Sequence, residues 1–181
     1  MERRMTVNAA GMIDTPGYLD SEYKMKLRPK WPLAKQALYD RLYLDIAWRF
    51  SKMSYAMRLK VGVCLVKDGL VAPGWNGMPA GADNQCEHLV GTEWVTNPEV
   101  SHAEENALDK ITRSTLSSVG AELYMTHSPC GHCAKQVANS GVVRVLYDES
   151  YRSDDGIIYL RNRGVLVQSW AELYGAARQP Q

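Results

Sequence analysis

The sequence lacks long hydrophobic runs. Among its 181 residues, no stretch approaches the roughly 18 consecutive apolar residues that a membrane-spanning helix requires. Residues 1–24 contain basic side chains but no apolar core of the kind that marks a secretory signal. We therefore expect a protein that neither crosses a membrane nor is secreted, and that acts in the cytoplasm.

The chain also has almost no excess of either positive or negative charge, and it has few cysteines. The chain has 21 basic and 20 acidic residues, a formal net charge of +1. A protein that holds nucleic acid by charge alone is usually more basic, so a polymeric nucleic-acid partner is not expected. The four cysteines are Cys64, Cys86, Cys130 and Cys133. Without a secretory signal, they favour a metal site or free thiols over a disulfide framework.

What is present is the composition of an ordinary folded protein. Hydrophobic residues make up 45% and charged residues 23% of the chain, which argues against disorder. The length suits one domain with its own core. Residues 1–32 contain glycines and prolines without a sustained apolar period, so we interpret them as an N-terminal extension. Residues 33–181 then form the folded domain.

Hydrophobic periodicity predicts alternating helices and strands. We expect helices at 33–53, 101–112, 130–141 and 154–163, a weakly helical tail from 170 onward, and strands at 61–69, 70–75, 121–128, 142–149 and 165–169. Asp68-Gly69 predicts a tight turn between the first two strands, Gly141 predicts a helix C-terminus, and residues 76–85 predict a loop. This order indicates a layered α/β domain whose sheet is mostly parallel after the first hairpin.

The first predicted helix has an apolar stripe. Leu38, Leu42 and Ile46 recur at helical spacing, and neighbouring aromatic residues broaden the stripe.

Two short segments contain the residues for a chemical reaction. The first is His102-x-Glu104, and the second is a Pro-Cys-x-x-Cys segment, 25 residues further on, that contains Cys130 and Cys133. Zinc-dependent nucleobase deaminases share this signature. A Cys-x-x-Cys pair at a helix start lets both thiolates face one point, where the helix N-terminus favours negative charge. With His102 as third ligand, the fourth tetrahedral position is left to water, as in catalytic zinc sites.

Glu104 is the candidate catalytic residue. Two thiolates and a neutral imidazole cancel the charge of Zn²⁺, so such a site should acidify its water less than a three-histidine site. A nearby base is then useful. Glu104 is two residues from His102 and can take a proton from the water and return it to the substrate.

Other interpretations of these residues stay open. Cys-x-x-Cys can also be a redox pair or half of a structural zinc site. His132 lies between the two cysteines and is a rival to His102 as a ligand. Cys86 with His88 could bind a second metal. Cys64 alternates within a predicted strand and is expected to be a buried apolar residue.

The motifs resemble those of the cytidine deaminase superfamily, and in particular of phage and bacterial deoxycytidylate (dCMP) deaminases. The similar segments are GWNGMPAG at 74–81, HAEENA at 102–107 and PCGHCAK at 129–135. The resemblance covers about residues 35–168. It implies a three-layer α/β/α cytidine-deaminase-like fold with a central mixed sheet of about five strands. It also implies zinc-dependent hydrolysis of dCMP to dUMP, in the host cytoplasm if a phage encodes the chain.

The resemblance also implies substrate contacts. Asn76 matches a position that binds the sugar 3′-hydroxyl, and Arg58 and Tyr151 match residues that reach the 5′-phosphate. Ala103 and Ser128 are further candidate substrate contacts. An arginine fork can bond two phosphate oxygens. The alternatives are a left-handed turn residue for Asn76, a surface charge for Arg58 and a partly buried core residue for Tyr151.

Regulation and assembly follow from the resemblance alone. Members of the family are often activated by dCTP and inhibited by dTTP, with Mg²⁺ on the bound triphosphate, and commonly form homohexamers. Gly77, Arg113 and Arg152 match possible effector contacts. The alternative for Arg113 is a surface arginine near the end of a helix, where the helix dipole favours a positive charge.

Two rival functions share some of these features. A tRNA or single-stranded nucleic-acid base deaminase has the same zinc motifs, but the balanced charge and the loop at 76–81 speak against it. A non-catalytic zinc module for assembly would have no need of Glu104.

Overall fold

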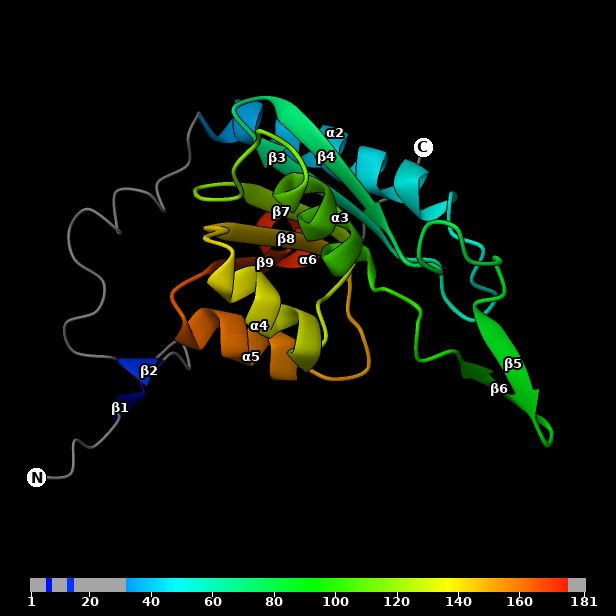
Figure 1. Cartoon of the computed structure of the whole chain (residues 1–181). Coiled ribbons are helices and arrows are strands. Elements are labelled where there is room, and N and C mark those ends of the chain that lie inside the picture. Colours follow the sequence, from blue (N-terminus) through cyan, green and yellow to red (C-terminus); the bar gives the residue numbers. More distant parts are fainter. Residues whose placement is uncertain (1–5, 8–12, 15–31, 176–181) are drawn as a thin grey trace, which may run out of the picture.

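The computed structural model describes residues 6–7, 13–14 and 32–175 (Figure 1). Within the predicted extension, strands β1 (Thr6–Val7) and β2 (Ile13–Asp14) form one short antiparallel pair. The other residues of 1–31 lie outside the described part. In that part, no helix has the length and apolar character needed to span a membrane.

A five-stranded mixed sheet forms the centre of the domain. Its strands are β3 (Gly62–Lys67), β4 (Leu70–Trp75), β7 (Glu122–His127), β8 (Arg144–Glu149) and β9 (Leu166–Ser169). They are arranged in the order β4-β3-β7-β8-β9. The pairs β3–β4 and β3–β7 are antiparallel, whereas β7–β8 and β8–β9 are parallel. The prediction of a sheet that becomes parallel after the first hairpin is confirmed.

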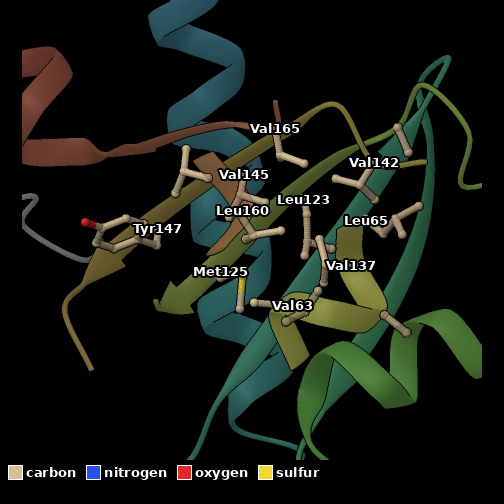
Figure 2. Close-up of a cluster of buried hydrophobic side chains, with 14 of the residues drawn as sticks. Val63, Leu65, Leu123, Met125, Val137, Val142, Val145, Tyr147, Leu160 and Val165 are labelled. Carbon is tan, nitrogen blue, oxygen red and sulfur yellow. The ribbon is translucent and has the colours of Figure 1, made fainter. Parts of the chain in front are cut away.

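Helices cover both faces of the sheet. One layer contains α3 (Ala103–Thr112), α4 (Gly131–Asn139) and α5 (Asp155–Asn162); the other contains α2 (Leu33–Ser51) and the short α6 (Trp170–Tyr174) (Figure 1). Alternate strand residues feed two cores. Leu65, Leu123 and Val145 face α3, α4 and α5 (Figure 2). Cys64 and Leu146 face α2. The three-layer α/β/α architecture is therefore confirmed.

Turn chemistry sets the element boundaries as predicted. Asp68 and Gly69 both have positive φ, which is the geometry of a type I′ hairpin turn between β3 and β4. Gly141, just after α4, also has a left-handed backbone. The buried Cys64 side chain, as expected, packs in an apolar cluster.

The apolar stripe of α2 is only partly buried. Leu38 and Leu42 are 66% and 47% exposed. Tyr39 and Ile46 pack against the core, and the buried side chains of the helix are Gln36, Asp40, Tyr43, Leu44, Ala47 and Ser51. The helix turns its Asp40 side toward a charged residue on the sheet. The periodicity of apolar residues does not reveal such a contact.

That charged residue is Arg144 on β8. Its guanidinium holds the fully buried Asp40 carboxylate through two bonds, of 2.7 Å and 2.6 Å. Gln36 and Tyr174 donate to the same carboxylate at 2.8 Å each. Burial by itself raises the pKa of Asp40, but the hydrogen bonds from Arg144 and its other partners outweigh burial, so the pKa lies below its usual value.

Replacing Arg144 should destabilise the domain strongly. Arg144→Met leaves the Asp40 charge buried without its cation, and losing one member of a buried ion pair costs about 3–5 kcal/mol. We expect a fall of this size in the free energy of unfolding, measured by urea denaturation at neutral pH. Arg41→Met, on the exposed side of the same helix, should change it by less than about 0.5 kcal/mol.

The pH dependence of this pair has a definite sign. Because the folded-state pKa of Asp40 is lowered, its stabilisation is present above the unfolded pKa, which is about 3.9, and is lost as pH falls through the folded value. The difference between wild type and Arg144→Met should therefore shrink in acid. A difference that stays constant down to complete acid unfolding would contradict this assignment.

One element was not predicted. Strands β5 (Glu87–Val90) and β6 (Glu93–Thr96) form an antiparallel hairpin that extends away from the central sheet (Figure 1). Apolar residues stand side by side in its sequence, and Leu89, Val90, Trp94 and Val95 are all substantially exposed. The hairpin therefore shows no alternation of buried and exposed positions that could have indicated strands.

Candidate active site

Two helix N-termini meet beside the sheet. His102 is the N-cap residue of α3, and Cys130 is the N-cap residue of α4, where its sulfur accepts a hydrogen bond from the Cys133 amide. β7 leads through Ser128 and Pro129 directly into α4. Because both helices begin at this point, their positive ends favour negatively charged ligands here.

His102, Cys130 and Cys133 come together as a possible metal site. His102 Nδ1 lies 3.6 Å from Cys130 Sγ and 3.2 Å from Cys133 Sγ, and the three donor atoms all lie within 4.8 Å of one another. Ligands of a tetrahedral zinc are about 3.4–3.8 Å apart when Zn–S is about 2.3 Å and Zn–N about 2.1 Å. The donor set and its spacing therefore fit Zn²⁺.

The two thiols of this cluster are already polarised. Hydrogen bonding with Cys133 lowers the pKa of Cys130 to about 3, and the same contact raises the pKa of Cys133. The hydrogen bond with Cys130 raises the pKa of His102 to about 9. Metal binding would displace the protons that His102 and Cys133 carry without a metal.

Glu104 lies next to the cluster without belonging to it. Its side chain is in the first turn of α3 and is 4% exposed. Burial raises the pKa of Glu104 to about 7. A carboxyl group with such a pKa can both accept and return a proton near neutrality.

Glu105 is a further residue of the site that sequence reasoning missed. It accepts a hydrogen bond from the His102 backbone N–H at 2.8 Å, which completes a capping box at the start of α3. It also bonds the exposed His132 and Gln136, each at 3.0 Å. His132 is thereby held at Glu105, outside the cluster of three ligands. The His-x-x-Glu spacing at a helix start was the available signal.

A pocket opens beside the cluster and Glu104. All five predicted substrate residues line it: Arg58, Asn76, Ala103, Ser128 and Tyr151. So does Arg152, which the resemblance assigns to possible effector contacts. Sequence reasoning missed Glu87, Thr96 and His127, which also line the pocket. Only the folded chain shows that these three face it, because they come from the β5–β6 hairpin and the end of β7.

The Asn76 amide is used to hold the backbone. Its Oδ1 accepts from Val61 N–H at 2.8 Å, and its Nδ2 donates to the Leu59 carbonyl at 2.9 Å. Asn76 does not have the left-handed backbone of a turn residue, because Asp68 is the one non-glycine residue with positive φ in the described part of the chain.

The hydroxyl of Ser128 holds Tyr151 in place. Ser128 is buried, and its Oγ accepts from the Tyr151 backbone N–H at 2.7 Å. The Arg152 guanidinium lies 5.4 Å from the centre of the Tyr151 ring. These contacts bring the Tyr151 side chain and the Arg152 guanidinium to the same wall of the pocket.

His127 contributes a polar ring. Its Nδ1 lies 3.0 Å from Thr126 Oγ1, and its Nε2 lies 3.2 Å from Glu149. Burial lowers the pKa of His127, so the neutral form is favoured. Trp48 packs on the ring, with 5.7 Å between ring centres.

Two predicted residues lie elsewhere. Gly77 pairs with Ser101 in an isolated β-bridge just before His102. Arg113 is exposed at the C-terminal end of α3, where its guanidinium bonds the Asp109 carbonyl at 3.2 Å. Neither residue lines the pocket.

Cys86 and His88 form no further cluster of metal ligands. His88 Nδ1 makes a short contact with Asn97 Oδ1, and the Cys86 side chain is buried. Within residues 32–175 and the two short strands, His102, Cys130 and Cys133 are the one group of at least three histidine, cysteine or carboxylate ligands.

Comparison with known proteins agrees with this geometry. Residues 39–149 match the model of the family described as cytidine and deoxycytidylate deaminase zinc-binding region. The chain is 32% identical over 167 residues to deoxycytidylate deaminase of Enterobacteria phage T4, covering 68% of this chain and 86% of that protein. For deoxycytidylate deaminase of Mycobacterium phage D29, identity is 36% over 132 residues, with coverage of 66% and 95%.

A solved structure is also similar. The crystal structure of dCMP deaminase from the cyanophage S-TIM5, in complex with dCMP and dUMP, superposes with a TM-score of 0.68 at 44% identity. The match covers 72% of this chain and 96% of the cyanophage chain. The chain therefore belongs to the cytidine and deoxycytidylate deaminase family.

Proposed function

We propose that this protein catalyses the hydrolytic deamination of dCMP to dUMP. The observation that carries the proposal is one pocket that joins an open three-ligand metal cluster, a buried carboxyl group and two arginines. The cluster and Glu104 suit attack of water on a pyrimidine ring, and the arginines suit a phosphate. The phage relatives named deoxycytidylate deaminase support the same substrate.

The residues have distinct roles in this reaction. His102, Cys130 and Cys133 would hold Zn²⁺, which when bound acts as a Lewis acid and makes water nucleophilic near neutral pH. Glu104 accepts one proton from the attacking water and delivers it to ring N3, then takes the second proton from the new C4 hydroxyl and delivers it to the leaving amino group. The C4–N4 bond breaks, ammonia leaves, and C4 keeps the oxygen from water.

The remaining pocket residues bind the nucleotide. Arg58 and Tyr151 bind the 5′-phosphate, and Asn76 binds the sugar 3′-hydroxyl with the hydrogen-bonding capacity that its backbone bonds leave. Ala103 and Ser128 form the wall beside the base. The support is that all five line the pocket.

We also propose regulation and assembly of the kind that the family implies. Activation by dCTP and inhibition by dTTP, with Mg²⁺ on the triphosphate, would involve Gly77 and Arg113 outside the pocket, together with Arg152, which lines the substrate pocket itself. The working unit would be a homohexamer of 33–181 domains, each with its 1–32 extension, acting in the cytoplasm (of the host, if a phage encodes the chain). The exposed position of Arg113, away from the pocket, is compatible with a separate effector site.

Substrate selectivity tests the function. In an ultraviolet assay of the zinc-loaded protein, kcat/KM for dCMP should exceed that for deoxycytidine by about a hundredfold or more, because each charged phosphate contact contributes about 1.5–3 kcal/mol. CMP, dCTP and a tRNA anticodon stem-loop are compared in parallel, each with and without dCTP, dTTP and Mg²⁺ as effectors. Preferred deamination of the stem-loop would favour a nucleic-acid deaminase, and no turnover of any substrate would favour a non-catalytic zinc module.

Arg58→Ala separates phosphate binding from chemistry. We expect kcat/KM for dCMP to fall by about 10- to 100-fold, while kcat/KM for deoxycytidine stays unchanged. Arg41→Ala is the matched control, since Arg41 is exposed on α2 and does not line the pocket. Equal losses on the two substrates would remove Arg58 from the phosphate site.

A further inference from the structure

We infer that the first rung of the β5–β6 hairpin, formed by Glu87 and Thr96, positions Arg58 for the substrate's phosphate. Glu87 and Thr96 are directly paired across the two strands. Both line the substrate pocket together with Arg58. The inference rests on the proposed function, and it gives the hairpin a role in substrate specificity.

Glu87 holds the backbone of Arg58. Its carboxylate accepts from the Met57 N–H at 3.1 Å and from the Arg58 N–H at 3.4 Å. Glu87 is only 2% exposed, so these bonds form away from water, where charge-assisted hydrogen bonds are strong. The buried carboxylate therefore fixes where the arginine leaves the main chain.

Thr96 holds the side chain of the same arginine. Its Oγ1 accepts from Arg58 Nη1 at 3.2 Å. A free arginine loses about 2 kcal/mol of rotamer entropy when it is immobilised. A guanidinium that is already bonded at one nitrogen has less entropy to lose when it binds a phosphate. Thr96 is thus placed to orient the Arg58 guanidinium before the phosphate binds.

The segment that carries Arg58 depends on such anchors. Residues 54–61 lie between α2 and β3 and form neither helix nor strand. Asn76 holds its far end through Leu59 and Val61. Glu87 and Thr96 hold the part at Met57 and Arg58, so the segment is fixed on both sides of the arginine.

The base of the hairpin is itself tied down. Asn97 follows β6 directly, and its backbone N–H donates to the Cys86 carbonyl at 2.8 Å. Its Nδ2 donates to the Gln85 carbonyl at 2.6 Å. The outer part of the hairpin is exposed, and the ordered rung at its base is the part that touches Arg58.

Thr96→Val is the sharpest test. Valine keeps the shape and strand preference of threonine but removes the acceptor, and Thr96 is exposed, so folding should be unaffected. We expect KM for dCMP to rise about three- to tenfold, as loss of one hydrogen bond predicts, with kcat unchanged. Thr96→Ser should restore wild-type KM, and kcat/KM for deoxycytidine should be unchanged in both variants.

Glu87→Gln tests the backbone anchor. In the glutamine side chain, one of the two terminal atoms is a nitrogen that donates and cannot accept from an N–H. We therefore expect KM for dCMP to rise at least as much as in Thr96→Val. Glu93→Gln, in the same hairpin but away from the rung, is the matched control and should behave as wild type. If Glu87→Gln does not fold, Thr96→Val alone decides the question.

A double variant links the effect to Arg58. In the Arg58→Ala background, Thr96→Val should cause no further loss on dCMP, because both changes affect one contact. Three results would overturn the inference: a Thr96→Val variant with wild-type KM for dCMP, losses on dCMP that add up in the double variant, or an equal loss on deoxycytidine. These results differ from failure of the proposed function itself, in which wild type would not deaminate dCMP or Arg58→Ala would show no selective loss.

Discussion

Glu104→Gln is expected to reduce kcat for dCMP deamination by about a thousandfold or more. Glutamine keeps the size of the side chain but cannot take a proton from water, and general acid–base catalysis by one group contributes about 10²–10⁴ in rate. One carboxyl group serves both the water and the leaving amino group in the proposed reaction, so its loss should affect both steps. Steady-state kinetics at saturating dCMP measures the effect.

Zinc content distinguishes this role from a structural one. Glu104 is outside the three-ligand cluster, so Glu104→Gln should retain as much zinc as wild type by elemental analysis. Glu99→Gln, an exposed change shortly before α3, is the matched control and should be fully active. A Glu104→Gln protein that holds zinc and turns over at nearly the wild-type rate would exclude Glu104 as the proton carrier.

Cys133→Ala is expected to remove both the metal and the activity. The side chain of Cys133 is fully buried and lies 3.2 Å from His102 Nδ1, so no water can easily replace its sulfur. With two of three ligands left, we expect most of the zinc to be lost and activity to fall by more than about a hundredfold.

Cys64→Ala is the matched control for that variant. Cys64 is equally buried but packs in the apolar cluster under α2, so its replacement should leave zinc content and kcat unchanged. Wild type treated with a strong chelator should lose activity and regain it when Zn²⁺ is returned. Activity that survives complete removal of zinc would contradict a metal-dependent reaction.

Sequence reasoning succeeded where the determining residues are close in the chain. Asp68-Gly69 sets its turn through its own backbone preferences, and the Cys130-x-x-Cys133 spacing brings two sulfurs together within one helical turn. His102 required one further step, the pairing of its His-x-Glu segment with the Cys-x-x-Cys segment 25 residues further on. The fold follows from the order of such local elements, and the sheet is mostly parallel after its first hairpin, as predicted.

Sequence reasoning failed where interacting residues are far apart in the sequence. The buried face of α2 is set by Asp40, whose cation Arg144 is 104 residues away. An apolar pattern predicts that a charge faces water, and only the tertiary partner reverses this. The same applies to Arg58, whose neighbours Glu87 and Thr96 lie 29 and 38 residues further on. The motif indicated which residue could bind a phosphate but not what holds it.

Isotope labelling of the product is the most direct test of the central claim. The protein is incubated with dCMP in H₂¹⁸O, and the nucleotide is analysed by mass spectrometry alongside measurement of released ammonia. Hydrolytic deamination predicts dUMP that carries one ¹⁸O at C4, with one ammonia for each dUMP formed. Unchanged dCMP, or dUMP without the label, would contradict the proposed reaction.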